Sequence, residues 1–366
     1  ICASFGTRER PFDFLDLCAL GTVVDVAPLS GENRILAKFG IEEIARTKNI
    51  GLKTMIENAG IKDKIINTYH LSFILGPRIN ASGRMSDAEL ALKLLLSRDP
   101  KDANDIAQRL EIENRNRQQV EELTLKDSLR LVAEQEKDKC RVIILSNEGW
   151  HEGVIGIVAS KVVDQFYRPT ILISLKDGRG KGSGRSVPGF PLAEALRSCH
   201  QHLISYGGHK QAAGLVIDQA KIPEFERAIN EYAERFPAEI LTPKTYIDTT
   251  ISLDEINETF IEYLQRFEPT GVENPTPTFL GRNLEVVGYP RVIGDKHLKF
   301  ALREKNKVFP AIGYGLGEKI IGLKVGRSRV DAVFTVEEDQ FQGKKKTMLK
   351  IKDMREVSYN VAESSR

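Results

Sequence analysis

Residues 141–175, RVIILSNEGWHEGVIGIVASKVVDQFYRPTILISL, decide the fold of the middle of the chain. Arg141–Leu145 and Thr170–Leu175 are rich in Ile and Val and predict strands, whereas Val154–Phe166 has the apolar spacing of a helix. The alternation continues with a predicted strand at Leu215–Ile217 and predicted helices at Leu192–His202 and Pro223–Phe236. Strands and helices that alternate in this way indicate an α/β domain.

A long helix is predicted directly before this domain. Residues 101–136 contain neither Gly nor Pro and are rich in Glu, Gln, Arg, Leu and Ala, which favour helix. Asn114 and Arg117 interrupt its apolar stripe on the same face. Because unpaired buried polar groups are costly, two readings stay open: the pair has a partner, or the helix is an exposed linker whose packing stops there.

The two ends of the chain have different patterns. Residues from Ile35 to about Ala59 and residues 86–97 are helical in pattern. After residue 245 the pattern changes to five short strands separated by turns: Leu284–Val287, Leu298–Leu302, Phe309–Tyr314, Asp331–Val336 and Met348–Asp353. Five such strands predict a small barrel such as an OB-fold, a class that binds single strands with basic grooves and stacked aromatics.

Composition limits the function classes. The 366 residues carry a net charge of only +2, so any surface that binds a polyanion must be local. No apolar run is long enough for a membrane span. The cysteines, at positions 2, 18, 140 and 199, form no C-x-x-C pair, which favours buried free thiols in a reducing cytoplasm. Since the chain starts at Ile1 without Met, we expect that it begins mid-protein.

Asp25 is a candidate metal ligand. It interrupts the apolar run ALGTVVDVAPL at residues 19–29, and an acid in such a run is costly unless it is paired or binds a cation. On this segment alone a hydrogen-bonded or surface aspartate is the more common outcome. Asp16 is a second acid nearby but stands in a more polar setting.

Residues 76–85, GPRINASGRM, form a candidate phosphate-binding segment. Gly and Pro predict a rigid irregular loop just before a helix, and Arg78, Asn80 and Arg84 project from it. The planar guanidinium fork of Arg suits phosphate oxygens. The alternative is a loop at a helix N-terminus with surface arginines.

Two glycine-rich segments form a second candidate. Residues 178–186, GRGKGSGRS, would let the backbone approach a ligand closely, and Ser183 and Arg185 share a face if the segment is extended. Residues 207–214, GGHKQAAG, predict a tight turn that opens a helix or strand, with His209 able to donate to a phosphate. Six Lys or Arg against two acids between residues 176 and 213 give a local balance of +4. The alternative is a flexible hairpin tip.

Taken in order, these segments resemble the RecJ family of the DHH phosphoesterase superfamily. ALGTVVDVAPL and GPRINASGRM are similar to motifs of its catalytic domain, and WHEGVIGIVASKV, GSGRS and GGHKQAAGL are similar to its DHHA1 domain. FEPTGVENPTPTF and GDKHLK resemble the family's OB-fold. The resemblance implies these domains: residues 1–100 from the DHH domain, 101–137 as connecting helix, 138–238 as DHHA1, 240–358 as OB-fold and 359–366 as tail.

The family cuts single-stranded DNA from the 5′ end in DNA repair and recombination, using Mn²⁺ or Mg²⁺. By resemblance, Asp25 is a metal ligand, and His209 lines the catalytic cleft. The phosphate or backbone would be bound by Arg78, Asn80, Arg84, Asn114, Arg117, Ser183 and Arg185. The implied partners are single-stranded DNA, a single-strand-binding protein and a RecQ-type helicase, with no membrane, and we expect a cytoplasmic monomer.

The chain departs from the family pattern in one respect. It has no D-x-D before Asp25 and no adjacent histidine pair, so most metal ligands of the family are absent. We therefore expect an N-terminally truncated chain that binds DNA weakly and cleaves little or nothing. Two other readings are a non-catalytic DHHA1–OB module that binds single strands or a protein, and an enzyme for short oligonucleotides or cyclic dinucleotides.

Overall fold

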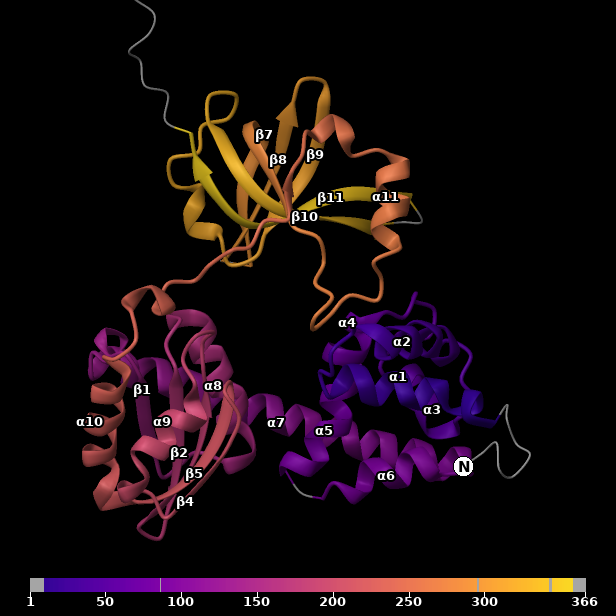
Figure 1. Cartoon of the computed structure of the whole chain (residues 1–366). Coiled ribbons are helices and arrows are strands. Elements are labelled where there is room, and N and C mark those ends of the chain that lie inside the picture. Colours follow the sequence, from indigo (N-terminus) through magenta and orange to yellow (C-terminus); the bar gives the residue numbers. More distant parts are fainter. Residues whose placement is uncertain (1–9, 86, 295, 342–343, 358–366) are drawn as a thin grey trace, which may run out of the picture. The chain divides into compact units, whose positions relative to one another are not determined.

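The computed structural model describes residues 10–85, 87–294, 296–341 and 344–357. It consists of two compact units, which are considered separately (Figure 1). The first contains Ile1–Leu20 and Gly40–Pro243, and the second contains Gly21–Phe39 and Lys244–Arg366. The predicted tail, residues 359–366, lies outside the described residues.

The N-terminal part of the chain is helical. Its helices are α1 (Leu15–Val24), α2 (Gly31–Ile44), α3 (Ile50–Asn58), α4 (Thr68–His70), α5 (Gly76–Met85), α6 (Glu89–Leu96) and α7 (Pro100–Glu134). The predicted helical stretch from Ile35 to Ala59 is two helices, because Asn49 caps α3 by accepting a hydrogen bond from the Leu52 N–H at 2.9 Å.

The segment GPRINASGRM was predicted as an irregular loop, and this prediction is wrong: it forms α5. A π-helical turn, Leu71–Leu75, precedes α5, and the Gly76 N–H donates to the Leu71 carbonyl one residue beyond the α-helical spacing. A proline in a helix loses one hydrogen bond and clashes with the carbonyl four residues earlier. The wider π turn relieves this clash, so Pro77 is accommodated without breaking the helix.

The long helix is confirmed as α7, which Asp99 caps by accepting from the Lys101 N–H at 3.2 Å. Asn114 and Arg117 are both buried and hydrogen-bonded to each other, so the reading that gave them a partner is the correct one.

The α/β domain is confirmed. Its sheet has the order β1-β2-β3-β5-β4, with β1 and β2 parallel and the other pairs antiparallel. Residues of α9 and α10 share one apolar core with the sheet, and α8 with the end of α7 shares another, so helices cover both faces (Figure 1). The elements are β1 (Ile143–Asn147), α8 (Glu152–Phe166), β2 (Thr170–Lys176), β3 (Arg179–Arg185), α9 (Leu192–Ser198), β4 (Ser205–Gly208), β5 (Ala212–Asp218) and α10 (Ile222–Ala233).

The glycines of GRGKGSGRS have a different role from the one predicted. They form strand β3, and Gly180, Gly182 and Gly184 are buried on its core face. A Cβ on Gly182 would lie 2.8 Å from Leu215, and one on Gly184 would lie 2.8 Å from Leu192. These glycines therefore make room for core side chains. The second segment, GGHKQAAG, contains the end of β4, a turn at residues 209–211 and the start of β5, so the predicted turn that opens a strand is confirmed.

The C-terminal barrel is confirmed in the second unit. Five strands follow one another around it, and β10 pairs with β7 to close it. Its elements are β6 (Thr249–Thr250), α11 (Glu258–Gln265), β7 (Phe279–Ile293), β8 (His297–Glu304), β9 (Lys307–Gly313), β10 (Arg329–Phe341) and β11 (Lys344–Glu356). In the same unit the Leu29 N–H donates to the Val272 carbonyl at 2.7 Å, so the chain after α1 is held by the loop between α11 and β7.

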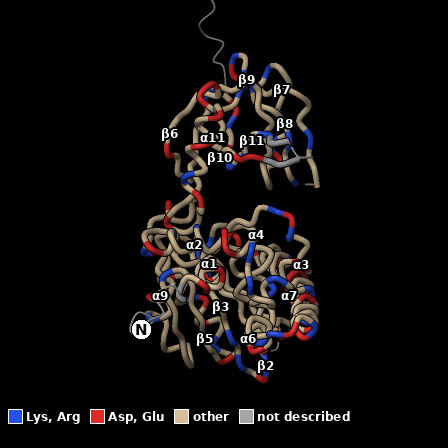
Figure 2. Tube along the Cα trace, turned by 90° about the vertical axis from the view of Figure 1, so that its right-hand side faces the viewer, with Lys and Arg blue, Asp and Glu red and all other residues tan. Residues whose placement is uncertain are grey.

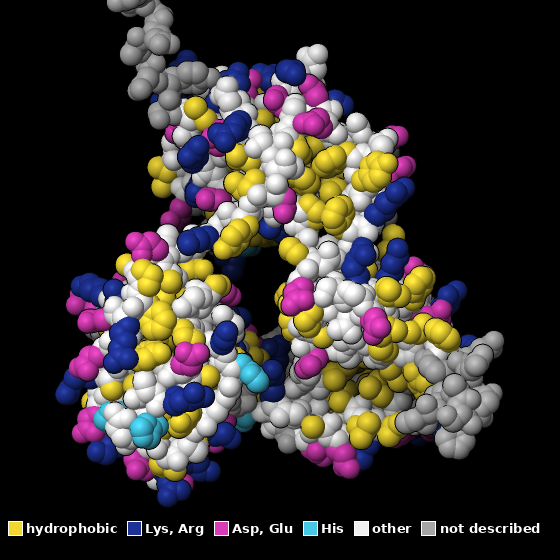
Figure 3. Space-filling model, viewed as in Figure 1, with side chains coloured by type: hydrophobic (Ala, Val, Ile, Leu, Met, Phe, Trp, Pro, Cys, Tyr) yellow, Lys and Arg dark blue, Asp and Glu magenta, His cyan; other side chains and the backbone are white. Residues whose placement is uncertain are grey.

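Surface charge is mixed, as the low net charge predicts. Lys and Arg alternate with Asp and Glu along the trace (Figure 2) and over the visible face of the body that holds β1–β5 (Figure 3). No helix among the described residues is long and apolar enough to cross a membrane. Of the described cysteines none forms a disulfide; Cys199 is buried as predicted, but Cys18 is exposed, and Cys2 is not among the described residues.

Candidate phosphate-binding site

Strand β3 and helix α5 bring together two arginines of the first unit. Ser183 and Arg185 alternate to the partly exposed face of β3, as predicted for an extended segment. The Arg185 Nη1 donates to the Ser183 Oγ at 3.3 Å and to the Gly184 carbonyl at 2.8 Å. Since the serine oxygen accepts this bond, its own proton remains available to a ligand. Within the described part of the chain neither Arg84 nor Arg185 forms an ion pair.

Helix α8 passes close to this site because two of its residues are glycines. A Cβ on Gly156 would lie 2.8 Å from the Ser183 Oγ and 3.1 Å from the Arg185 Nη2. A Cβ on Gly153 would lie 2.1 Å from the Arg84 carbonyl, and the Arg84 Nη1 reaches the Gly153 carbonyl at 3.4 Å. The two glycines therefore let α8 hold β3 and the end of α5 in contact.

Helix α7 contributes a buried polar network. Arg117 donates to the Glu121 carboxylate and, through Nη2, to the Asn114 Oδ1 at 3.1 Å. Glu121 also forms an ion pair with the Lys161 Nζ of α8, at 2.5 Å. The Nε of Arg117 is buried without a partner among the described residues. Glu121 and Lys161 were not predicted, although the spacing of four residues between Arg117 and Glu121 on one helix was a usable signal.

The charges of the arginines lower one another's pKa. Desolvation of the Arg84 guanidinium and the positive charge of Arg117 lower the pKa of Arg84, although the residue as a whole is exposed; the Glu121 charge opposes them. Burial and the charge of Arg84 lower the pKa of Arg185. The charge of Arg84 thus interacts with those of Arg117, Arg185 and Glu121, and Lys161 pairs with Glu121. Such a cluster would be relieved of repulsion by a bound anion.

Of the other residues predicted to bind phosphate, Arg78 has protein partners, whereas Asn80 and His209 are exposed. Arg78 pairs with Glu111 at 2.7 Å and donates to the Ile74 carbonyl at 2.6 Å. Asn80 is exposed on α5. His209 is exposed in the β4–β5 turn, where its backbone N–H donates to the Ala212 carbonyl at 2.8 Å. Ala212 pairs with Arg185 in the sheet, so His209 lies at the same end of the sheet.

Asp25 is exposed in the turn after α1, in the second unit. The apolar run is a helix that ends before Asp25, so the alternative of a surface aspartate describes its position. Asp16 is the buried acid: it accepts from the Thr47 hydroxyl and from the Leu17 N–H at 2.7 Å. Among the described residues no three His, Cys, Asp or Glu side chains cluster so as to hold a metal ion. The donors present do not fit a metal site by themselves.

Two domains of the chain match family models. Residues 139–235 match the DHHA1 domain, and residues 247–353 match the RecJ OB domain.

Curated relatives match most of the chain. The single-stranded-DNA-specific exonuclease RecJ of Bacillus subtilis (strain 168) is 34% identical over 94% of this chain and 44% of its own length. The RecJ of Thermus thermophilus is 37% identical over 80% of this chain and 42% of its own length. The chain thus spans less than half the length of these relatives.

A solved structure agrees with the sequence relatives. The crystal structure of RecJ in complex with Mn²⁺ from Thermus thermophilus superposes with a TM-score of 0.82 at 31% identity, covering 96% of this chain and 52% of that one. A second crystal structure of RecJ from the same organism contains Mg²⁺ and superposes equally well. With a DHHA1 domain followed by a RecJ-type OB barrel, the chain belongs to the RecJ family.

Proposed function

We propose that this chain is the DNA-binding part of a 5′→3′ exonuclease that acts on single-stranded DNA. The observation that carries the proposal is that the two glycines of α8 approach Arg84 and Arg185, with Arg185 hydrogen-bonded to Ser183. Neither arginine forms an ion pair within the described residues. Relatives named as single-stranded-DNA-specific exonucleases support the same substrate.

In this proposal the site binds the phosphate at the 5′ end of the strand. Arg84 and Arg185 donate to its oxygens, and the Ser183 hydroxyl donates its free proton. Arg117 stays buried and adds positive potential, while Glu121 and Asn114 fix its orientation. Asn80 and His209 line the approach to the site.

In this proposal a metal ion acts in the hydrolysis step, and the described residues of this chain do not form its site by themselves. Mn²⁺ or Mg²⁺ accompanies the related structures, and Asp25 is the residue here that the resemblance assigns as a ligand. One exposed carboxylate does not make a two-metal site. We expect the isolated chain to bind DNA but not to hydrolyse it.

The binding test compares a 5′-phosphorylated single strand with a 5′-hydroxyl strand by fluorescence anisotropy. We expect the phosphorylated strand to bind more tightly, and Arg84→Ala or Arg185→Ala to abolish the difference at a cost of roughly tenfold or more in affinity, as for hydrogen bonds to charged groups. Arg46→Ala is the matched control, because Arg46 forms an exposed ion pair with Glu43 and takes no part in the site. Equal affinity for both strands would contradict the proposal.

The catalytic test incubates the isolated chain with labelled single strand and Mn²⁺. Metal-dependent turnover by this polypeptide would overturn the expectation that it is inactive alone. A protein containing this chain that binds single strands yet never cleaves them would instead favour the binding module. Preference for a dinucleotide over a long strand would favour the third reading, an enzyme for short oligonucleotides.

Partners and location follow from the resemblance. We propose a cytoplasmic monomer that meets a single-strand-binding protein and a RecQ-type helicase on DNA. Light scattering after size-exclusion chromatography tests the monomer, and co-sedimentation with each purified partner tests the contacts.

A further inference from the structure

Residues 68–85 form one continuous helical segment that leads to the phosphate-binding site. It consists of α4, the π turn Leu71–Leu75 and α5, which ends with Arg84 and Met85. One side of the segment packs into the protein; its buried residues include Leu71, Leu75, Gly76, Ala81 and Ser82.

The other side of the segment is exposed at Tyr69, Phe73, Asn80 and Arg84. These residues are spaced four, seven and four apart, the spacing of one helix face. Phe73 and Arg84 are eleven residues apart, which corresponds to about 16 Å along a helix axis at 1.5 Å per residue. An aromatic pair therefore lies on the same exposed side as the arginine, a few nucleotide lengths away.

Tyr69 and Phe73 pack against each other rather than into the core. Their ring centroids are 5.2 Å apart with planes tilted by 30°, and the residues remain 59% and 68% exposed. His70 meets the edge of Tyr69 at 5.9 Å. Burial and the positive charge of Lys64 lower the pKa of His70, and Lys64 is an exposed cation five residues before Tyr69 in the chain.

We propose that Tyr69 and Phe73 form a stacking platform for bases that follow the 5′ nucleotide. Exposed aromatic rings stack on bases of any sequence, and a neighbouring cation attracts the phosphates between them. The inference rests on the proposed function, because Arg84 and Arg185 must hold the 5′ phosphate for the strand to run along this face. It adds to that function a second contact, which sets how long a strand must be to bind well.

The affinity test uses a 5′-phosphorylated single strand of about 12 nucleotides, within the usual site size of single-strand-binding domains. Tyr69→Ala with Phe73→Ala should weaken its binding by roughly tenfold, while Tyr69→Phe with Phe73→Tyr should bind like the wild type. A 5′-phosphorylated mononucleotide reaches only the arginines. It should therefore bind the wild type and the double alanine variant with equal affinity in a competition assay. Ile65→Ala is the matched control, because Ile65 is 74% exposed and apolar but cannot stack.

The position test places 5-iodouracil at successive nucleotides and identifies the cross-linked residue by mass spectrometry. We expect a cross-link to Tyr69 or Phe73 from a nucleotide downstream of the 5′ end and none from the terminal one. If the aromatic pair instead contacts protein, the double alanine variant keeps full affinity and cross-links appear elsewhere, which overturns the platform while the preference for a 5′ phosphate persists. If the wild type shows no preference for a 5′ phosphate, the proposed function itself is overturned.

Discussion

Asp16 and Asp25 show how similar acids in one sequence segment acquire different roles. Asp16 is only 7% exposed and has two hydrogen-bond partners, whereas Asp25 is exposed after the helix has ended. A buried acid contributes to stability through its partners, and an exposed one remains available to a ligand. The more polar setting of Asp16 in the sequence does not reveal its burial, because the period of the helix, rather than the local polarity, decides which residue faces inward.

Replacing these acids should separate structure from function. We expect Asp16→Ala to lower the free energy of unfolding by about 2 kcal/mol, because it leaves Thr47 and the Leu17 N–H without their acceptor. Asp25→Asn should change it by less than about 0.5 kcal/mol, as for other exposed positions. Urea unfolding measures both values; an equal loss in the two variants would contradict the assignment.

Glu121 is the residue on which the buried charges of α7 depend. Glu121→Gln should lower the free energy of unfolding by about 3 kcal/mol, because it leaves Arg117 buried and uncompensated. The double variant Arg117→Met with Glu121→Leu should regain most of that stability, since neither charge is then buried. Denaturant unfolding tests both. A double variant as unstable as the single one would show that packing, rather than charge, accounts for the loss.

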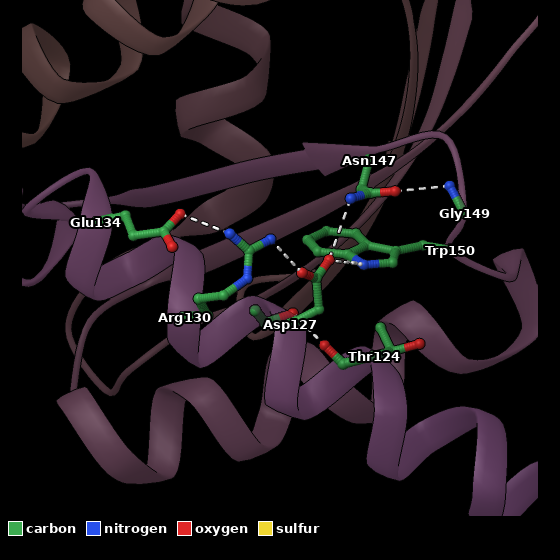
Figure 4. Close-up of polar contacts among 8 residues, drawn as sticks. Thr124, Asp127, Arg130, Glu134, Asn147, Gly149 and Trp150 are labelled. Atoms are coloured by element: carbon green, nitrogen blue, oxygen red, sulfur yellow. Dashed lines mark hydrogen bonds and ion pairs between the residues drawn. The ribbon is translucent and has the colours of Figure 1, made fainter.

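At the scale of elements, the C-terminal end of α7 is fixed to the α/β domain by Asp127 (Figure 4). Its Oδ2 accepts from the Trp150 Nε1 at 2.9 Å and from the Asn147 Nδ2 at 3.1 Å, and its Oδ1 accepts from Arg130 at 2.6 Å. Asn147 ends β1, and Trp150 lies in the segment between β1 and α8. Helix α8 follows directly and carries Gly153 and Gly156, which approach the arginines. These hydrogen bonds therefore fix the position of the C-terminal end of α7 relative to the start of α8, which approaches the site.

Asp127→Ala should loosen this contact. We expect a loss of about 2 kcal/mol in the free energy of unfolding, because a charged acceptor of three side chains is removed. Trp150 is the only tryptophan of the chain, so its emission reports on this contact directly, and we expect a shift to longer wavelength. Glu134→Ala is the control, because Glu134 forms only an exposed pair with Arg130 and should cost little. Unchanged emission and stability in Asp127→Ala would rule out the anchor.

At the scale of the whole molecule, affinity for DNA should come from arginine–phosphate contacts rather than from net charge or a metal. Raising the salt concentration from about 50 to 200 mM should weaken binding of a 5′-phosphorylated strand by roughly tenfold through counterion release. Removing divalent ions with EDTA should leave the affinity unchanged, because the described residues form no metal cluster. Anisotropy titrations at the two salt concentrations and with EDTA check this. Binding that requires Mn²⁺ would show that a metal takes part in DNA binding.

The sequence by itself determined the order and type of most elements. Strand and helix periods are local properties, so the α/β domain, the long helix α7 and the five barrel strands could be predicted from them. It also singled out Arg84, Ser183 and Arg185 by their residue types and by resemblance.

Only the tertiary structure decided which polar groups meet. Lys161 reaches Glu121 from a different helix, and Gly156 approaches Ser183 and Arg185 across the space between α8 and β3. The helical conformation at Pro77 depends on the π turn before it, and the burial of Asp16 depends on Thr47. The partners of buried charges and close-packed glycines come from segments far apart in the chain, so no local pattern records them, and the packing of those segments sets the geometry of the site.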